Sequence, residues 1–168
     1  MPAVPIAAPI TRDLTIDGFG LAAVGVIGLV ASIIVVGGNA TRVIVPWIIV
    51  LLVLGLAQVV IGGGWLRNAI QDAPEAPSEL VIEAPGVQTR RAALPTIVAA
   101  VLLVLALLVV APFAPIVAGL AAGAAATDLR SRQWISADEQ AQGVTILRET
   151  TPLPFATSRK RLWVRPAG

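Results

Sequence analysis

The residues best suited to chemistry lie in short charged segments that flank long uncharged ones. Arg12, Asp13 and Asp17 precede the first uncharged stretch, and the segment DLRSR (128–132) follows the last one. Two arginines beside an aspartate could hold a phosphate group, such as that of a lipid, through paired hydrogen bonds. The same residues also fit a simpler interpretation, in which they are the charged ends of helices.

A second group of candidate residues is acidic and lies in the middle of the chain. Asp72, Glu75, Glu79 and Glu83 follow one another at spacings of three or four residues, which could suggest metal binding or acid–base catalysis. The chain has no His, Cys or Tyr, so the commonest general base and the commonest metal ligand are missing. Prolines also interrupt the segment. We therefore predict a solvated loop here, and no catalytic residues, metal site or cofactor in the chain.

The elements that position these groups are predicted from hydropathy. Hydrophobic residues make up 57% of the chain and charged residues 13%, against about 25% charged residues in an average soluble domain. Charged residues are absent from 18–41, 43–66 and 92–127. A spanning helix needs roughly 20 apolar residues, so the first two stretches each suit one span. The third is too long for one span and somewhat short for two.

Two prolines favour a division of the third stretch. Pro112 and Pro115 each remove a backbone donor and disfavour helical geometry in the residue before them. Four spans also place every Lys and Arg except Arg42 on one side of the membrane, as the excess of basic residues in cytoplasmic segments requires. Three spans would put the basic C-terminal residues on the same side as Arg42. A short last span that returns as a re-entrant segment is the weaker alternative, because it would put the tail outside.

The sequence therefore predicts an all-α integral membrane protein with four transmembrane helices, arranged as two short-looped helical hairpins. A composition rich in Arg, Ala, Val, Gly and Pro is typical of a GC-rich bacterial genome. We expect a multi-pass protein of the bacterial inner membrane with both termini in the cytoplasm. The predicted segments are an N-terminal cytoplasmic segment (1–17), a first hairpin (18–66), a cytoplasmic loop (67–91), a second hairpin (92–127) and a basic cytoplasmic tail (128–168).

Local patterns predict some structure in the soluble segments. Residues 80–82 have the composition of a short strand, which Pro85 and Gly86 would end in a turn. In the tail, Ser136 and Glu139 match a helix capping box. The segments 143–147 and 161–164 are predicted as two strands of a small β-hairpin.

Small residues at four-residue spacing predict close helix packing in lipid. The packing partner is either another span of the same chain, namely the first or the third, or a second subunit. Gln58 is a polar residue in the second span, where we expect an interhelical hydrogen bond; a polar path through the membrane is the alternative. The predicted packing residues are Gly28 and Ser32 in the first span, and Ala118, Gly119, Ala122, Gly123 and Ala126 in the fourth.

A basic cluster near the C-terminus predicts a contact surface. It suits anchoring to anionic lipid headgroups, or docking on an acidic partner protein. Four charges and one aromatic residue are too few to indicate nucleic acid. The cluster comprises Arg159, Lys160, Arg161, Trp163 and Arg165.

These features favour a non-catalytic role. We expect an accessory or structural subunit that assembles, stabilises or regulates a larger bacterial membrane complex, with other integral membrane subunits and anionic lipids as partners. The alternative is a small homo-oligomeric channel or a holin-like pore former, which also requires short hairpins and small-residue packing. The absence of ionisable residues from the predicted spans argues against an ion-coupled pump.

Overall fold

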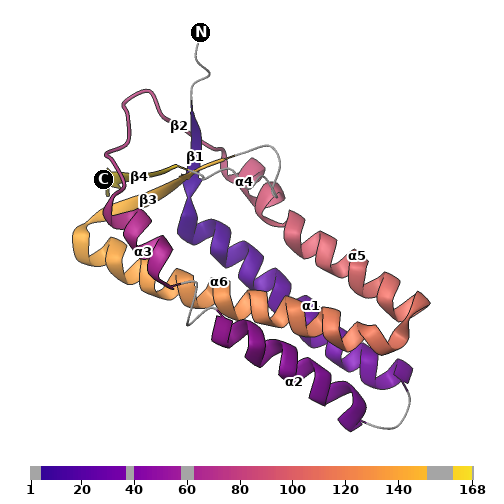
Figure 1. The fold of residues 1–168 in the computed structure, drawn as a ribbon. Helices are drawn as coiled ribbons and strands as arrows, with labels where there is room; N and C mark the ends of the chain where they lie inside the picture. The colour runs from indigo at the N-terminus through magenta and orange to yellow at the C-terminus, as the bar shows by residue number, and fades with distance from the viewer. Residues whose placement is uncertain (1–4, 37–39, 58–62, 151–160, 168) are drawn as a thin grey trace.

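The computed structural model describes residues 5–36, 40–57, 63–150 and 161–167, apart from the side chains of residues 55, 56, 63–65 and 67. It is mostly helical, with a small sheet at one end of a helical bundle (Figure 1). In chain order the elements are β1 (Ile6–Pro9), α1 (Ile10–Val36), α2 (Ala40–Ala57), α3 (Gly63–Gln71), β2 (Val81–Ile82), α4 (Pro85–Ala92), α5 (Leu94–Val109), the 3₁₀ turn η2 (Ala111–Phe113), α6 (Ala114–Gln142), β3 (Val144–Glu149) and β4 (Leu162–Pro166).

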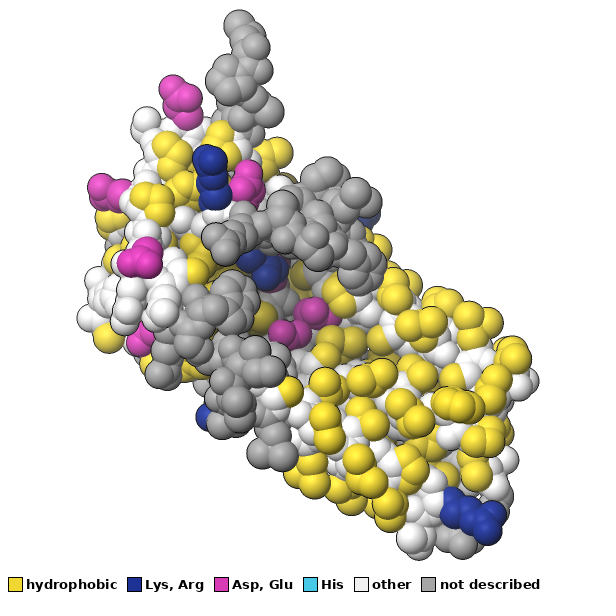
Figure 2. All heavy atoms as spheres, viewed as in Figure 1, with side chains coloured by type: hydrophobic (Ala, Val, Ile, Leu, Met, Phe, Trp, Pro, Cys, Tyr) yellow, Lys and Arg dark blue, Asp and Glu magenta, His cyan; other side chains and the backbone are white. Residues whose placement is uncertain are grey.

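Three helical stretches are long and apolar enough to cross a membrane, namely Ile10–Val36, Pro85–Val109 and Ala111–Gln142. A shorter apolar helix spans Ala40–Leu54. Apolar side chains cover the outside of the bundle instead of its interior alone: Ile34 is 74% exposed and Leu108 78% exposed. On the face drawn in Figure 2, hydrophobic side chains cover the bundle and acidic side chains gather toward the end that carries the sheet.

The long uncharged stretch 92–127 divides into two helices, as its prolines predicted. Helix α5 ends at Val109, the backbone of Val110 leaves helical geometry with φ −141° and ψ 65°, and η2 leads into α6. Pro115 lies in the first turn of α6, where its missing N–H costs no hydrogen bond.

Helix α6 does not end near Thr127, where the basic tail was expected to begin. It continues to Gln142 and stops at Gly143, whose φ of +64° is the left-handed conformation that glycine adopts at helix ends. The sequence contains no Gly or Pro between 128 and 142, so nothing local interrupts the helix. The predicted capping box is therefore wrong, because Ser136 lies inside the helix.

Close contacts between small residues give the relative directions of α1 and α6. A Cβ built on Gly25 would lie 2.8 Å from the Cβ of Ala122, and one on Gly18 would lie 3.0 Å from the side chain of Leu129. Residue numbers fall along α1 as they rise along α6, so these two helices are antiparallel.

Two other pairs of neighbouring helices, α2 with α6 and α1 with α5, run parallel. Gly119 packs on Val50 and Gly123 on Leu54, so α2 and α6 point the same way. Gly20 packs on Thr96 of α5, and Gly28 of the same helix α1 packs on Leu103 further along α5. In chain order, α1, α2, α5 and α6 therefore alternate in direction. Helix α6 packs against both α1 and α2 (Figure 1).

The mostly helical fold agrees with the prediction, but the sheet has four strands and is larger than the β-hairpin expected in the tail. Its strand order is β2-β1-β3-β4, with β1 parallel to β2 and antiparallel to β3, and β3 antiparallel to β4. The N-terminal segment, for which no strand was predicted, supplies the inner strand β1. Of the two predicted tail strands, residues 144–147 lie in β3 and residues 162–164 lie in β4, and these strands pair with each other within the larger sheet. The predicted turn at Pro85 and Gly86 is wrong, because Pro85 begins helix α4.

The sheet is buried on both faces by separate clusters. One cluster contains Ile10, Ile70, Ile135, Ile146 and Leu162. The other contains Ala7, Leu80, Leu147 and Trp163. We call the sheet together with α3, α4 and the last turns of α6 the head. Because Ile10 belongs to α1 and Ile135 to α6, the same two helices build the bundle and support the head.

Candidate functional site

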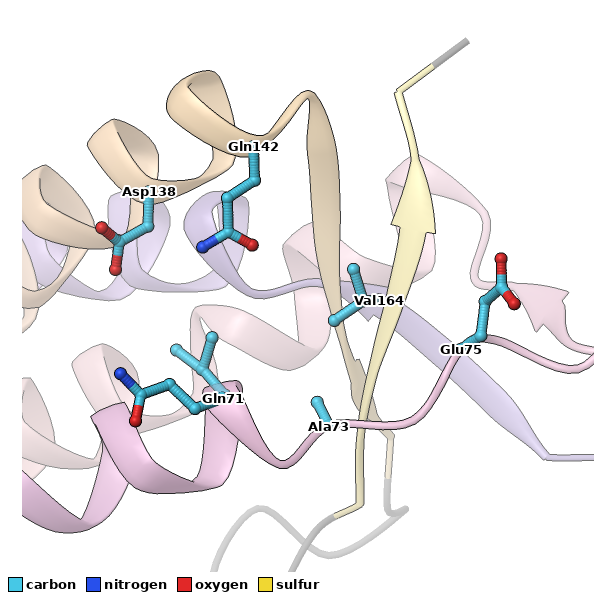
Figure 3. Close-up of a pocket in the computed structure, with 7 residues that line it drawn as sticks. Gln71, Ala73, Glu75, Asp138, Gln142 and Val164 are labelled. Carbon is cyan, nitrogen blue, oxygen red and sulfur yellow. The ribbon is translucent and has the colours of Figure 1, made fainter.

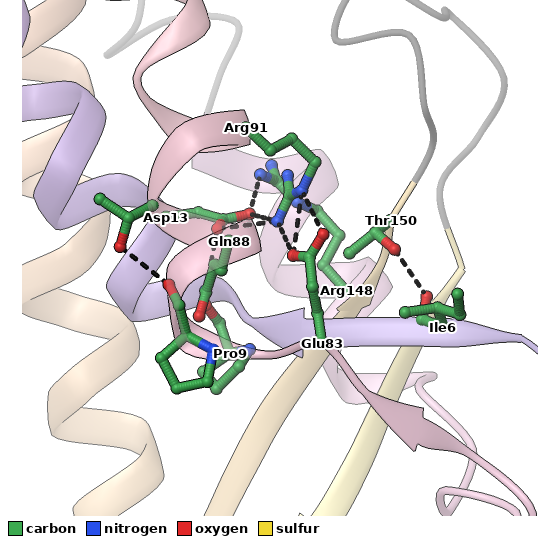
Figure 4. Close-up of polar contacts among 10 residues, drawn as sticks. Ile6, Pro9, Asp13, Glu83, Gln88, Arg91, Arg148 and Thr150 are labelled. Atoms are coloured by element: carbon green, nitrogen blue, oxygen red, sulfur yellow. Dashed lines mark hydrogen bonds and ion pairs between the residues drawn. The ribbon is translucent and has the colours of Figure 1, made fainter.

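A buried carboxylate joins three distant parts of the chain where the bundle meets the head. Asp13, 3% exposed, lies in the first turn of α1, where the helix N-terminus favours a negative charge. It accepts hydrogen bonds from Gln88 Nε2 at 2.9 Å, from Arg91 Nη2 at 3.0 Å and from Arg148 Nη2 at 2.8 Å (Figure 4). The N-terminal helix, the central segment and the C-terminal strand β3 therefore meet at one side chain.

Two further contacts complete this network, which we call the Asp13 network. Arg91 also pairs with Glu83, at 2.9 Å between Nη2 and Oε2. Gln88, 1% exposed, donates its second amide hydrogen to the carbonyl of Pro9 at 3.0 Å. Two carboxylates thus face two guanidinium groups, so the buried charges balance and each has a partner. This arrangement holds the N-terminal, central and C-terminal segments together.

A pair of carboxyl groups lies nearby, just outside the uncharged stretches. Asp17 of α1 and Asp128 of α6 hydrogen-bond to each other, and Thr96 Oγ1 of α5 approaches Asp17 Oδ1 at 3.5 Å. Burial, followed by the negative charge of Asp17, raises the pKa of Asp128 to about 7, against the charge of Arg148, which lowers it. Burial also raises the pKa of Asp17. Two carboxylates so close repel each other, and a hydrogen bond between them requires a proton on one, so the protonated form of Asp128 is favoured.

The carboxylates of the described residues form no group suited to a metal ion. Among the residues that the structure describes, no group of three or more Asp or Glu side chains is placed to hold a metal ion. Asp72, Glu75 and Glu79, considered above as an acidic loop, are exposed, whereas Glu83 is drawn into the Asp13 network.

Most predicted packing residues make contacts inside this chain. Gly28 faces Leu103 and Ala118, and the fully buried Ser32 donates its hydroxyl to the carbonyl of Gly28 at 2.6 Å. Ala118 is buried against α1.

The remaining small residues of α6 contact α2 or α1, with one exception. Gly119 lies against the backbone of Trp47, Gly123 lies against Leu54, and Ala122 lies against α1. Ala126 is exposed and takes no part in these contacts. Among the described residues, the small-residue rows therefore make close contacts within this chain.

The structure describes three of the five residues of the predicted basic surface, because Arg159 and Lys160 lie outside the described residues. Gln58, predicted to make an interhelical hydrogen bond, also lies outside them. Arg161 and Arg165 are exposed. Trp163 is 6% exposed and packs with Ala7, Leu80 and Leu147, so its ring belongs to the core and is not available at the surface.

The Asp13 network was missed in the sequence analysis, although part of it had a local signal. Gln88 and Arg91 are three apart and so share one face of a helix. Nothing in the sequence pairs Arg148 with Asp13, because that contact depends on the position of β3 beside β1.

Comparison with protein-family models, curated proteins and solved structures finds no match to this chain. The class of protein is therefore defined by the fold alone. The chain is mostly helical, with a small sheet and three helices long and apolar enough to span a membrane. This fold is consistent with a membrane protein.

Proposed function

We propose that this protein is a non-catalytic accessory subunit of a bacterial membrane complex. It crosses the inner membrane four times, keeps both termini in the cytoplasm and presents its head there to other subunits. The Asp13 network is the observation that carries the proposal. It fixes the N-terminal, central and C-terminal segments to one another, which a protein needs when its role is to offer a stable surface.

The alternating helix directions support four spans. Helix α1 begins at the head, so its end at Val36 lies at the opposite end of the bundle, where α2 begins. Helix α2 has 18 residues, a length of about 27 Å. That length comes close to the hydrocarbon thickness of about 30 Å. The exposed apolar side chains of all four helices suit contact with lipid.

The distribution of arginine supports a cytoplasmic head. Arg12, Arg90, Arg130 and Arg132 lie just beyond the uncharged stretches at the head end of the bundle. Arg42 lies in the first turn of α2, at the other end. Basic residues concentrate on the cytoplasmic side, and the arginines at the head end also suit anionic lipid headgroups.

The interior of the bundle favours an accessory role over the alternative, a homo-oligomeric pore. Buried polar residues of the described chain are Asp13, Ser32 and Gln88. Ser32 alone lies within one of the uncharged stretches, and its hydroxyl binds its own helix. Helix α6, whose glycines suggested an oligomer interface, uses them against α1 and α2.

The experiment is a pull-down from native membranes in mild detergent, through an affinity tag at the C-terminus, with the subunits identified and the particle mass measured. Stoichiometric, unrelated membrane proteins are the expected result. A particle that contains this chain alone as a homo-oligomer, and that conducts ions in liposomes, would replace the accessory role with the pore.

A further inference from the structure

A cleft of about 790 Å³ lies in the head, between α3, the last turns of α6 and strand β4. Its apolar surface comes from Ile70, Ala73 and Val164. Polar groups of α3 and α6 line it from opposite sides: Gln71 faces Asp138 and Gln142 across the opening (Figure 3). The cleft is therefore mainly polar, with an apolar patch formed by Ile70, Ala73 and Val164.

The shape of the cleft follows from how β4 is paired. The segment 74–76 lies along the outer edge of β4, where Ala76 N donates to Val164 O at 2.9 Å and Val164 N donates to Pro74 O at 3.0 Å. This pairing continues the chain from α3 along the sheet edge and brings Glu75 to the cleft.

The described residues that line the cleft carry negative charge. Glu75 and Asp138 are among them, and none of them is basic. None of the ion pairs between described residues involves either carboxylate. The complementary ligand is a cation.

The position of the cleft indicates a protein ligand in place of a lipid. Asp138 lies 11 residues beyond Thr127, the last residue of the uncharged stretch, which is roughly 16 Å further along α6. A headgroup in the bilayer does not reach so far. The volume also exceeds what a single side chain fills.

We propose that this cleft binds a basic segment of a partner protein. The aliphatic stem of a Lys or Arg lies on Ile70, Ala73 and Val164, because such stems cover apolar surface while the charged end stays polar. The charged end meets Asp138 or Glu75. Gln71 and Gln142 each offer a donor and an acceptor to the backbone of the bound segment. The inference rests on the proposed accessory role and names the surface through which that role operates.

The test uses the full-length protein in nanodiscs of neutral phosphatidylcholine, so that lipid charge does not attract the probe. The probe is a fluorescent peptide of alternating Lys and Ala, and binding is followed by fluorescence anisotropy. We expect it to bind the wild type, while the corresponding Glu-Ala peptide does not. The double variant E75Q/D138N should bind about tenfold more weakly, a loss of about 1.4 kcal/mol, because it removes both carboxylates from the cleft.

A matched variant separates the cleft from general surface charge. D72N/E79Q removes the same charge from exposed residues that do not line the cleft, and it should bind as the wild type does. Equal losses in both double variants, no effect of E75Q/D138N, or no binding to the wild type would each overturn the inference. An unchanged thermal midpoint in both double variants shows that folding is intact.

The same variants separate this inference from the accessory role. If E75Q/D138N retains membrane partners in the native pull-down as fully as the wild type does, the accessory role stands and the cleft inference fails. If the wild type purifies without partners but still binds the Lys-Ala peptide in the cleft, the accessory role fails and the cleft stands.

Discussion

Asp13 accepts a 2.8 Å hydrogen bond from Arg148, a residue 135 positions further along the chain. The contact ties the first turn of α1 to strand β3, and Arg91 reaches the same carboxylate from α4. The head is therefore held together by charge as well as by its apolar clusters. The network lies outside the uncharged stretches, at the point where the N-terminal, central and C-terminal segments meet.

Neutralising Asp13 should weaken the head. In D13N the carboxamide keeps the size of the side chain but leaves Arg148 without its ion-pair partner. Removing one member of a buried pair costs about 3–5 kcal/mol, and the partial exposure of Arg148 places the expected loss near the lower end. Thermal unfolding in detergent, followed by Trp fluorescence, measures the effect. D72N removes an exposed charge and serves as the control; equal stability of the two variants would contradict the role of the network.

The Asp17–Asp128 pair makes stability depend on pH. The pKa of Asp128 is raised to about 7, above the ordinary value that it regains on unfolding, so its contribution is complete below that ordinary value and is lost as the pH rises through 7. The thermal midpoint of the wild type should therefore fall between pH 5 and pH 8. D128N, which keeps a hydrogen-bonding side chain without the charge, should show a much smaller fall. Parallel curves for the two proteins would contradict the protonation of Asp128.

Gly25 tests whether the small residues serve this chain or a second copy. A Cβ at position 25 would lie 2.8 Å from the Cβ of Ala122 and 3.0 Å from its backbone, so G25A forces α1 and α6 apart. We expect a loss of about 1–3 kcal/mol, typical of overpacking.

The control is G86A, where nothing lies within 4 Å of the added Cβ and a helical position gains from alanine. It should leave stability unchanged or slightly higher. A change in oligomeric mass on G25A, with no loss of stability, would show instead that this face contacts another subunit.

Local chemistry explains what was predictable from the sequence. Pro112 and Pro115 act on their own backbone, so the break between α5 and α6 was visible without the fold. The rows of small residues in α6 indicated close packing, because small side chains at four-residue spacing let helices approach closely. Their partners were not predictable, since Gly119 and Gly123 face a helix far away in the sequence.

The failures also have physical causes. The charges at 128–132 end the apolar stretch but not the helix, because charged residues are compatible with helical backbone outside lipid. Strand β1 is four residues long and carries no alternating pattern, so it becomes a strand through its neighbours β2 and β3. Trp163 stands in a basic segment, yet strand pairing turns its ring into the core.

The proposed function requires one head, assembled in the cytoplasm from both ends of the chain and from its centre. The most direct test is the accessibility of single cysteines to a membrane-impermeant maleimide in intact cells. The chain has no cysteine of its own, so T41C, S78C and A167C can each be read separately. We predict that T41C is labelled in intact cells, and that S78C and A167C are labelled only after permeabilisation. Labelling of A167C in intact cells, with S78C protected, would mean three spans and would contradict the account.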